Sequence, residues 1–184
     1  MTRIAPFALT LLLAACGAKS QFIITAPAAT TETRVRVASI EVITVSLPAY
    51  AAAAAIVVED ASGALRPVAK SLWADDPPRG VTAALARSLD MKSTATVAVE
   101  PWPLNDAPEV RLEVRVDEML ARADGSFVMN GQFALSSQTG AVRDRLQRFA
   151  IVVPLADTAP ASVAAAAGTA IDGLADQILA QLKR

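Results

Sequence analysis

Two acidic pairs, Asp75–Asp76 and Asp117–Glu118, are the residues whose type and spacing could do chemistry. Two carboxyl groups can divide the roles of general acid and general base in glycoside hydrolysis. The surrounding sequence favours structural roles instead. Asp75–Asp76 come directly before two prolines at an expected helix start, and Asp117–Glu118 follow a strictly alternating strand pattern. Neither pair supplies enough oxygen ligands for a calcium site.

Cys16, the only cysteine, ends a Leu-Ala-Ala-Cys run that resembles the bacterial lipobox. Arg3 and an apolar stretch too short to span a bilayer precede it. We expect residues 1–15 to be a lipoprotein signal peptide and Cys16 to receive a diacylglyceryl group. The alternative is a buried cysteine that only fills space. Gly17 stands where inner-membrane lipoproteins often carry aspartate, which predicts anchoring at the outer membrane, facing the periplasm.

The composition excludes several kinds of activity. The chain has no histidine, so the commonest general base is missing, and zinc would lack its usual nitrogen and sulfur ligands. The formal net charge of −1 is too near neutral to indicate nucleic acid as a partner. We therefore expect a protein that is not an enzyme, with no catalytic residue, no metal and no cofactor other than the covalent lipid on Cys16.

Large side chains offer candidates for protein contacts. Trp73 and Trp102 are of the type enriched in binding hot spots, but large aromatics in an aromatic-poor domain more often supply buried area at the core or at a sheet edge. Tyr50 has the same two interpretations. A basic strand edge could either discourage sheet pairing or meet an acidic partner. Its arginines are Arg143, Arg145 and Arg148.

The first half of the chain predicts a tether, three strands and a helix. Residues 16–33 are rich in Thr, Ala and Ser and indicate a tether between the lipid and the domain. The expected strands cover residues 34–45, 56–58 and 65–72, and the alanine run at 51–55 is left without an assignment. Beyond Asp75–Asp76, one helical face is apolar, comprising Val81, Ala84, Leu85 and Leu89.

The second half predicts a meander of strands and a closing helix. Strands are expected over residues 94–99 and 111–116, and then a hairpin turns at Asp124–Gly125. A second turn at Thr139–Gly140 leads to a strand that ends at Pro154, and a helix follows over residues 161–182. We predict an α+β fold, in which two helices pack on one face of a largely antiparallel sheet, as a single domain over residues 34–184.

The order of these features resembles a known family. The lipobox is followed by Leu47-Pro48-Ala49-Tyr50, by Trp73-Ala74-Asp75 leading into a helix, and by Phe149 and Pro154 before an Ala-rich closing helix. This series is similar to the ABC-type transport auxiliary lipoproteins, the PqiC-like group, over nearly all of the mature domain. The chain departs from the family at the tryptophan motif, where Asp76 replaces the usual proline, and at the alanine run.

The resemblance implies a non-catalytic subunit of a system that moves phospholipid between two membranes. Its partners would be a periplasmic MCE-domain protein with an ABC permease and ATPase, the outer membrane through the anchor, and further copies of itself in a homo-oligomeric ring. The candidate partner-contact or structural residues are Leu47, Pro48, Tyr50 and Trp73. The alternative function is a general outer-membrane lipoprotein adaptor in envelope assembly or secretion, since a fold alone does not fix a function.

Overall fold

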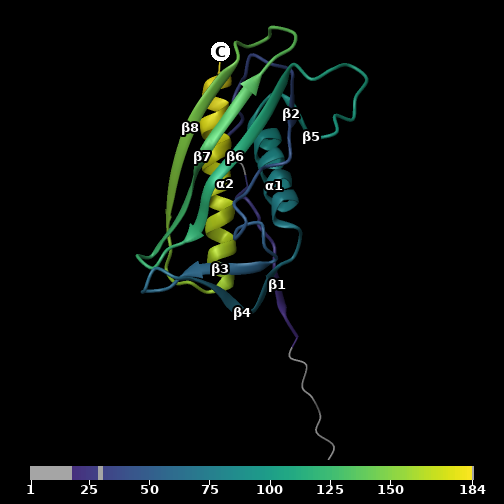
Figure 1. Ribbon diagram of the computed structural model, residues 1–184. Helices are drawn as coiled ribbons and strands as arrows, with labels where there is room; N and C mark the ends of the chain where they lie inside the picture. Colours follow the sequence, from purple (N-terminus) through teal and green to yellow (C-terminus); the bar gives the residue numbers. More distant parts are fainter. Residues whose placement is uncertain (1–17, 29–30, 184) are drawn as a thin grey trace, which may run out of the picture.

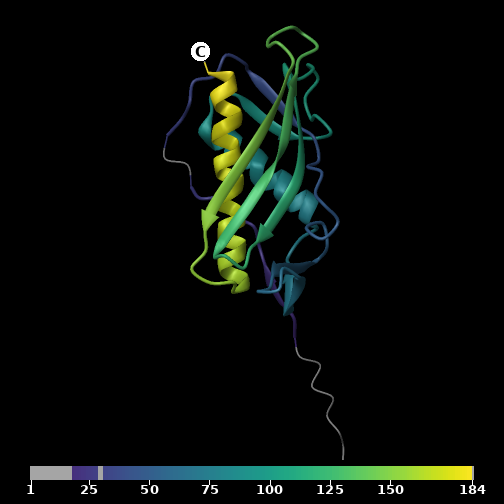
Figure 2. The same cartoon turned by 60° about the vertical axis from the view of Figure 1, so that its left-hand side comes forward.

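The computed structural model describes residues 18–28 and 31–183 as one α+β unit. The expected signal peptide, Cys16 and Gly17 lie outside the described residues. Eight strands form one curled sheet, and both helices pack against one of its faces (Figure 1, Figure 2). This arrangement confirms the predicted class. The elements are β1 (Ser20–Phe22), β2 (Ser39–Val42), β3 (Ala55–Glu59), β4 (Leu65–Trp73), α1 (Pro77–Lys92), β5 (Thr96–Val99), β6 (Val110–Ala121), β7 (Ser126–Ser136), β8 (Arg145–Pro154) and α2 (Pro160–Leu182).

Strand β6 lies at the centre of the sheet. On one side it pairs with β7, which pairs with β8, and both of these long ladders are antiparallel. On its other side, the first part of β6 pairs with β2 and its end pairs with β3, both in parallel. Strand β2 continues to β5, and β3 continues through β4 to β1. The sheet is therefore mixed, and the antiparallel part comprises its longest strands.

Helix α1 begins where the acidic pair and the prolines predict. Asp76 is the N-cap residue, and its Oδ2 atom accepts a hydrogen bond of 3.3 Å from the backbone N–H of Arg79. Pro77 and Pro78 occupy the first turn, where a backbone N–H has no partner within the helix. The expected apolar face of α1 is buried against the core.

Helix α2 buries the apolar face that its sequence predicts. Ile171, Leu174 and Ile178 are fully buried, and small alanines fill the remaining space beside α1 and the sheet. The core therefore relies on close packing of Val, Ile, Leu and Ala, as expected for a chain with only 4% aromatic residues.

A β-bulge in β6 lies at the acidic pair Asp117–Glu118. The pairing with β7 shifts register between Val116 and Glu118, so the alternating pattern stops there, as predicted. Gly131 lies opposite Val116, and a Cβ atom on Gly131 would lie 2.2 Å from the backbone oxygen of Arg115. This close approach excludes a side chain at Gly131.

Both expected hairpin turns are present. Gly125 and Gly140 have φ values of +82° and +76°, a region that residues with a side chain rarely adopt. The Asp124–Gly125 turn joins β6 to β7, and the segment that contains Gly140 joins β7 to β8.

The first predicted strand is shorter than residues 34–45. Only Ser39–Val42 forms a ladder, while Val35 and Ser46 make isolated bridges to Lys183 and Arg115. Buried Val35 and Val45 explain the strand-like pattern on either side of β2. These positions are buried in extended segments that lack a continuous neighbouring strand. In the alanine run, Ala51 and Ala52 donate backbone hydrogen bonds of 2.9 Å to the oxygen of Pro48 and form a turn before β3.

The tether expected over residues 16–33 is also shorter in the structure. Ser20–Phe22 forms β1, which pairs in parallel with the end of β4. Phe22 and Ile24 pack against the core, and the backbone N–H of Thr33 donates 2.6 Å to the oxygen of Lys92. Within the described residues, the first strand of the sheet therefore begins at Ser20, inside the expected tether. Phe22 and Ile24 are large apolar side chains that contact the core, which explains why this part of the segment packs rather than remaining solvated.

Candidate functional site

Trp73 lies at the junction where β4 ends and the chain turns toward α1. Its backbone N–H donates 2.8 Å to the oxygen of Ala54, and the N–H of Ala74 donates 2.9 Å to the oxygen of Phe22. The half-buried indole packs against the hydrophobic core. The two backbone bonds tie β1, the start of β3 and the start of α1 together at this junction.

A cleft opens beside Trp73, between α1 and the segment that follows β1. We call residues 23–28 the strap, since they leave β1 and pass over the helices. The cavity below the strap has a volume of about 320 Å³. Ile23, 71% exposed, stands at its margin. The helix side of the cleft is formed by Pro77, Arg79, Gly80, Ala83, Ala84 and Arg87.

The strap touches α2 at Gly168. A Cβ atom at this position would lie 2.0 Å from the backbone oxygen of Thr25 and 2.6 Å from its carbonyl carbon. Only a residue without a side chain permits this approach. The sequence predicts a weakened helix at Gly168 and Gly173, and the structure gives the reason for the first glycine, namely the crossing of the strap.

The acidic pair Asp75–Asp76 borders the same cleft and serves the start of the helix. Oδ1 of Asp75 accepts hydrogen bonds of 2.6 and 3.0 Å from Nη2 and Nε of Arg79, and these bonds lower the pKa of Asp75. Asp76 caps α1, as described above. Both carboxylates are thus engaged by the helix N-terminus, which confirms the structural interpretation of this pair.

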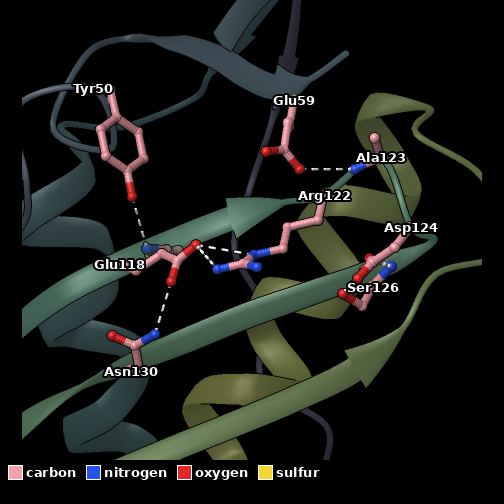
Figure 3. A network of polar contacts seen from close by, with 9 residues as sticks. Tyr50, Glu59, Glu118, Arg122, Ala123, Asp124, Ser126 and Asn130 are labelled. Carbon is pink, nitrogen blue, oxygen red and sulfur yellow. Dashed lines mark hydrogen bonds and ion pairs between the residues drawn. The ribbon is translucent and has the colours of Figure 1, made fainter. Parts of the chain in front are cut away.

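Glu118, at the bulge of β6, is the centre of a polar network (Figure 3). Its Oε1 atom accepts hydrogen bonds of 3.0 and 2.5 Å from Nε and Nη2 of Arg122, and its Oε2 atom accepts one of 2.8 Å from Nδ2 of Asn130. Both carboxylate oxygens of Glu118 therefore have hydrogen-bond partners. In the Asp117–Glu118 pair, Glu118 thus has a structural role. Nearby, Oε2 of Glu59 accepts a hydrogen bond of 3.1 Å from the N–H of Ala123, linking β3 to the end of β6.

Tyr50 joins the Leu47–Tyr50 motif to this network. Its hydroxyl accepts a hydrogen bond of 3.3 Å from the backbone N–H of Met119, directly after Glu118 (Figure 3). Burial raises the pKa of Tyr50, although the bond from Met119 acts in the opposite direction. Leu47 packs against the core, and Pro48 provides the oxygen that closes the following turn. The motif thus holds the crossing between β2 and β3 against β6.

Trp102 and the basic strand edge lie away from these contacts. Trp102 closes its own loop, since its Nε1 donates 2.7 Å to the oxygen of Asp106 and its backbone N–H donates 3.0 Å to Oε1 of Glu41. Glu41 is nearly buried and pairs with Nε of Arg111 at 3.2 Å. The structure does not bring Trp102 together with Trp73, and the arginines 143, 145 and 148 lie on or beside β8.

Two further properties of the described residues concern metal-binding clusters and membrane-spanning helices. Across residues 18–28 and 31–183, no three acidic side chains gather closely enough to hold a metal ion. Neither helix in that part of the chain is both long and apolar enough to cross a bilayer. The sequence reasoning missed the strap and its crossing at Gly168. The available signal was the apolar run Phe22–Ile24 in a segment otherwise rich in Thr, Ala and Ser.

Residues 22–179 match the family described as the ABC-type transport auxiliary lipoprotein component. The chain belongs to this family. The auxiliary lipoprotein is similar to the crystal structure of an uncharacterized protein, with 17% identity and a TM-score of 0.69 over 84% of this chain and 100% of that chain. It is also similar to a crystal structure of a DUF330 protein from Xanthomonas campestris, with 16% identity and a TM-score of 0.62 over 88% and 91% of the two chains. At these identities the likeness shows a shared fold. A comparison with curated proteins finds no match.

The family gives the auxiliary lipoprotein its general role. It is an auxiliary component of an ABC-type transport system, and a lipoprotein component of this kind is associated with a membrane. The resemblance inferred from the sequence is therefore confirmed at the level of the family.

Proposed function

We propose that this auxiliary lipoprotein is the outer-membrane end of an MCE/ABC-type system that transports phospholipid between membranes. In this proposal it is anchored through lipid on Cys16, faces the periplasm, performs no catalysis and needs no cofactor. It contacts a periplasmic MCE-domain protein that works with an ABC permease and ATPase, and it assembles with further copies of itself. The observation that carries the proposal is the match to the transport auxiliary family over residues 22–179.

The position of β1 supports a domain held close to its anchor. Ser20 follows Cys16 by four positions, and four extended residues reach about 14 Å. If Cys16 is lipidated, β1 and the adjacent β3 and β4 lie at the membrane-proximal end. The loop before β6 and the β7–β8 connection lie at the opposite end of the domain, where a periplasmic partner can reach them (Figure 1).

The polar groups of the described residues support an adaptor rather than an enzyme. Asp75, Asp76 and Glu118 are occupied by a helix start and by a structural network, as shown above. No histidine or second cysteine is present to take over general base or nucleophile chemistry. The protein would therefore act by placing a partner complex at the membrane.

The test is affinity purification of the lipidated protein from its native envelope in mild detergent, followed by mass spectrometry. We expect an MCE-domain protein with its permease and ATPase to copurify. The matched control is an unrelated soluble domain fused after residues 1–19 of this chain, which shares the anchor and lacks the folded unit. Recovery of envelope-assembly or secretion proteins instead would support the general adaptor function. Recovery of nothing beyond the control would reject both the transport function and the adaptor function.

A further inference from the structure

Strand β8 forms a long free edge of the sheet. It has ten residues, and within the described part of the chain β7 is its only strand partner. Figure 1 and Figure 2 show β8 as the outermost strand of the β6–β7–β8 ladder. A free edge carries backbone N–H and C=O groups that a further strand can pair with.

The other free edges are short, and one is capped. Strand β1 has three residues and β5 has four. On β5, Oδ1 of Asp90 accepts a hydrogen bond of 3.1 Å from the backbone N–H of Val97, so a side chain occupies one of its pairing groups. Among the described strands, β8 is therefore the edge best suited to extend the sheet.

The face of β8 that points away from the helices is apolar at two positions. Leu146 is 67% exposed and Val152 is 66% exposed. Both lie on the same face of β8 as Arg148, because side chains alternate along a strand. Leu146 lies next to Ala134 of β7 and Val152 lies next to Val128, so each is the outer end of an apolar cross-strand row.

The charges beside this edge are uncompensated. Other arginines on β6 or directly after it have acidic partners, since Arg111, Arg115 and Arg122 pair with Glu41, Glu113 and Glu118. Arg143, Arg145 and Arg148 are exposed, and none forms an ion pair with a carboxylate of residues 18–28 or 31–183. Arg145 donates a hydrogen bond of 2.5 Å to the neutral side chain of Gln181, and Gln132 is the neighbour of Arg148 across β7.

We propose that the free edge of β8 binds an extended acidic segment of a partner protein, which adds to the sheet as a further strand. The register sets the chemistry of this segment, because directly opposed side chains on one face interact. It would place an acidic residue opposite Arg148 and apolar residues opposite Leu146 and Val152. A second copy of β8 does not fit this description, since symmetric pairing would set the cationic edge of one copy against the same edge of the other.

This docking mode goes beyond the proposed transport role and does not depend on it. Backbone hydrogen bonds would supply affinity, while the side chains on alternate positions would supply specificity. The acidic segment would balance charges that the described residues leave without carboxylate partners.

The test uses the full lipidated protein in mild detergent and a labelled nine-residue peptide. The peptide carries valines opposite Leu146 and Val152, a glutamate opposite Arg148 and threonines elsewhere. Binding is followed by fluorescence anisotropy, and amide hydrogen exchange locates the site. In one control peptide, lysine replaces the glutamate. In the other, the backbone nitrogens that face β8 are methylated. We expect the glutamate peptide to bind and protect β8 amides, and each control to bind about tenfold more weakly.

Charge reversal on the protein provides the second measurement. Arg148→Glu should weaken binding of the glutamate peptide about tenfold and strengthen binding of the lysine peptide. Arg87→Glu, at an exposed position of α1, should change neither affinity. Unchanged far-ultraviolet circular dichroism checks that each variant folds. The proposal is overturned if the glutamate peptide does not bind, if backbone methylation has no effect, or if Arg148→Glu leaves the preference unchanged. In each case the arginines would only keep this edge unpaired.

Discussion

Nζ of Lys92, in the last turn of α1, lies 2.7 Å from Oδ2 of Asp172 in the middle of α2. Its second acidic partner is Asp176, at 2.8 Å, and Oδ1 of Asp172 accepts a further hydrogen bond of 2.7 Å from the buried hydroxyl of Ser88. The Lys92 side chain is only 12% exposed. This cluster therefore fixes the two helices against each other through a largely desolvated ion pair.

Replacing Lys92 by Met should lower the free energy of unfolding by about 2 kcal/mol, because Asp172 would keep its charge in a largely buried site without a cation. Urea unfolding of both proteins measures the difference. Lys183→Met, which removes an exposed ammonium group, is the control and should change stability by less than about 0.5 kcal/mol. Equal stabilities for the wild type and Lys92→Met would show that the cluster contributes nothing.

The same cluster predicts how stability depends on pH. Burial alone would lower the pKa of Lys92, but the hydrogen bonds and charges of Asp172 and Asp176 raise it above its usual 10.5. A raised pKa in the folded state means that the contribution is fully present below pH 10.5 and is lost as the pH rises through the higher folded value. The stability difference between the wild type and Lys92→Met should shrink in this range. If the difference in the free energy of unfolding stays constant up to the highest pH measured, the ion pairs of Lys92 do not raise its pKa in the folded state.

Tyr50 gives a direct optical readout of the network at the bulge, because it is the only tyrosine in the chain. Burial raises its pKa above the usual 10.0 in the folded protein. Absorbance at the phenolate band should therefore titrate at a higher pH in the native protein than in the same protein unfolded in urea. Tyr50→Phe removes the hydroxyl that accepts the hydrogen bond from Met119, so it should lower the free energy of unfolding by about 1 kcal/mol. Identical titrations in the two states would place Tyr50 in solvent.

The anchor prediction concerns Cys16. Cys16→Ala removes the only thiol that could receive the lipid, so the protein should move from the membrane fraction to the soluble fraction. Fractionation followed by immunoblotting measures this, with Gly17→Asp as a companion variant that keeps the thiol. We expect Gly17→Asp to stay membrane-bound and to shift toward the inner membrane. Outer-membrane retention of Cys16→Ala would reject the lipid anchor.

Much of the fold could be predicted because its signals are local. The 3.6-residue spacing of Val81, Leu85 and Leu89 and the cap at Asp76 define α1, and the alternation through Leu112, Val114 and Val116 defines the first part of β6. The turn at Asp124–Gly125 is equally local. In each case, residues within one element carry the information.

What could not be predicted depends on contacts between distant segments. Val35 and Val45 follow a strand-like pattern because they are buried. Only Ser39–Val42, between them, pairs with neighbouring strands in a continuous ladder. The pairing of β1 with β4 joins residues that lie about fifty positions apart, and no local pattern specifies it. The cleft beside Trp73 was missed for the same reason, since the strap that covers it comes from the expected tether.

Gly168 tests whether the strap is an integral part of the fold. Alanine is a better helix former than glycine by about 1 kcal/mol, so helix propensity alone predicts that Gly168→Ala stabilises α2. The structure predicts the opposite, because the new Cβ atom would lie 2.0 Å from the backbone oxygen of Thr25. The strap must move away, and we expect the free energy of unfolding to fall by about 1–3 kcal/mol.

Gly173→Ala is the matched control in the same helix. Its added Cβ atom would lie 3.7 Å from two carbon atoms of Ile151, which is an ordinary contact, so this variant should gain up to about 1 kcal/mol. Amide hydrogen exchange locates the difference: protection over residues 20–26 should fall in Gly168→Ala and stay unchanged in Gly173→Ala. If both variants gain stability and keep that protection, then α2 does not need the glycine, and the strap does not lie against it in solution.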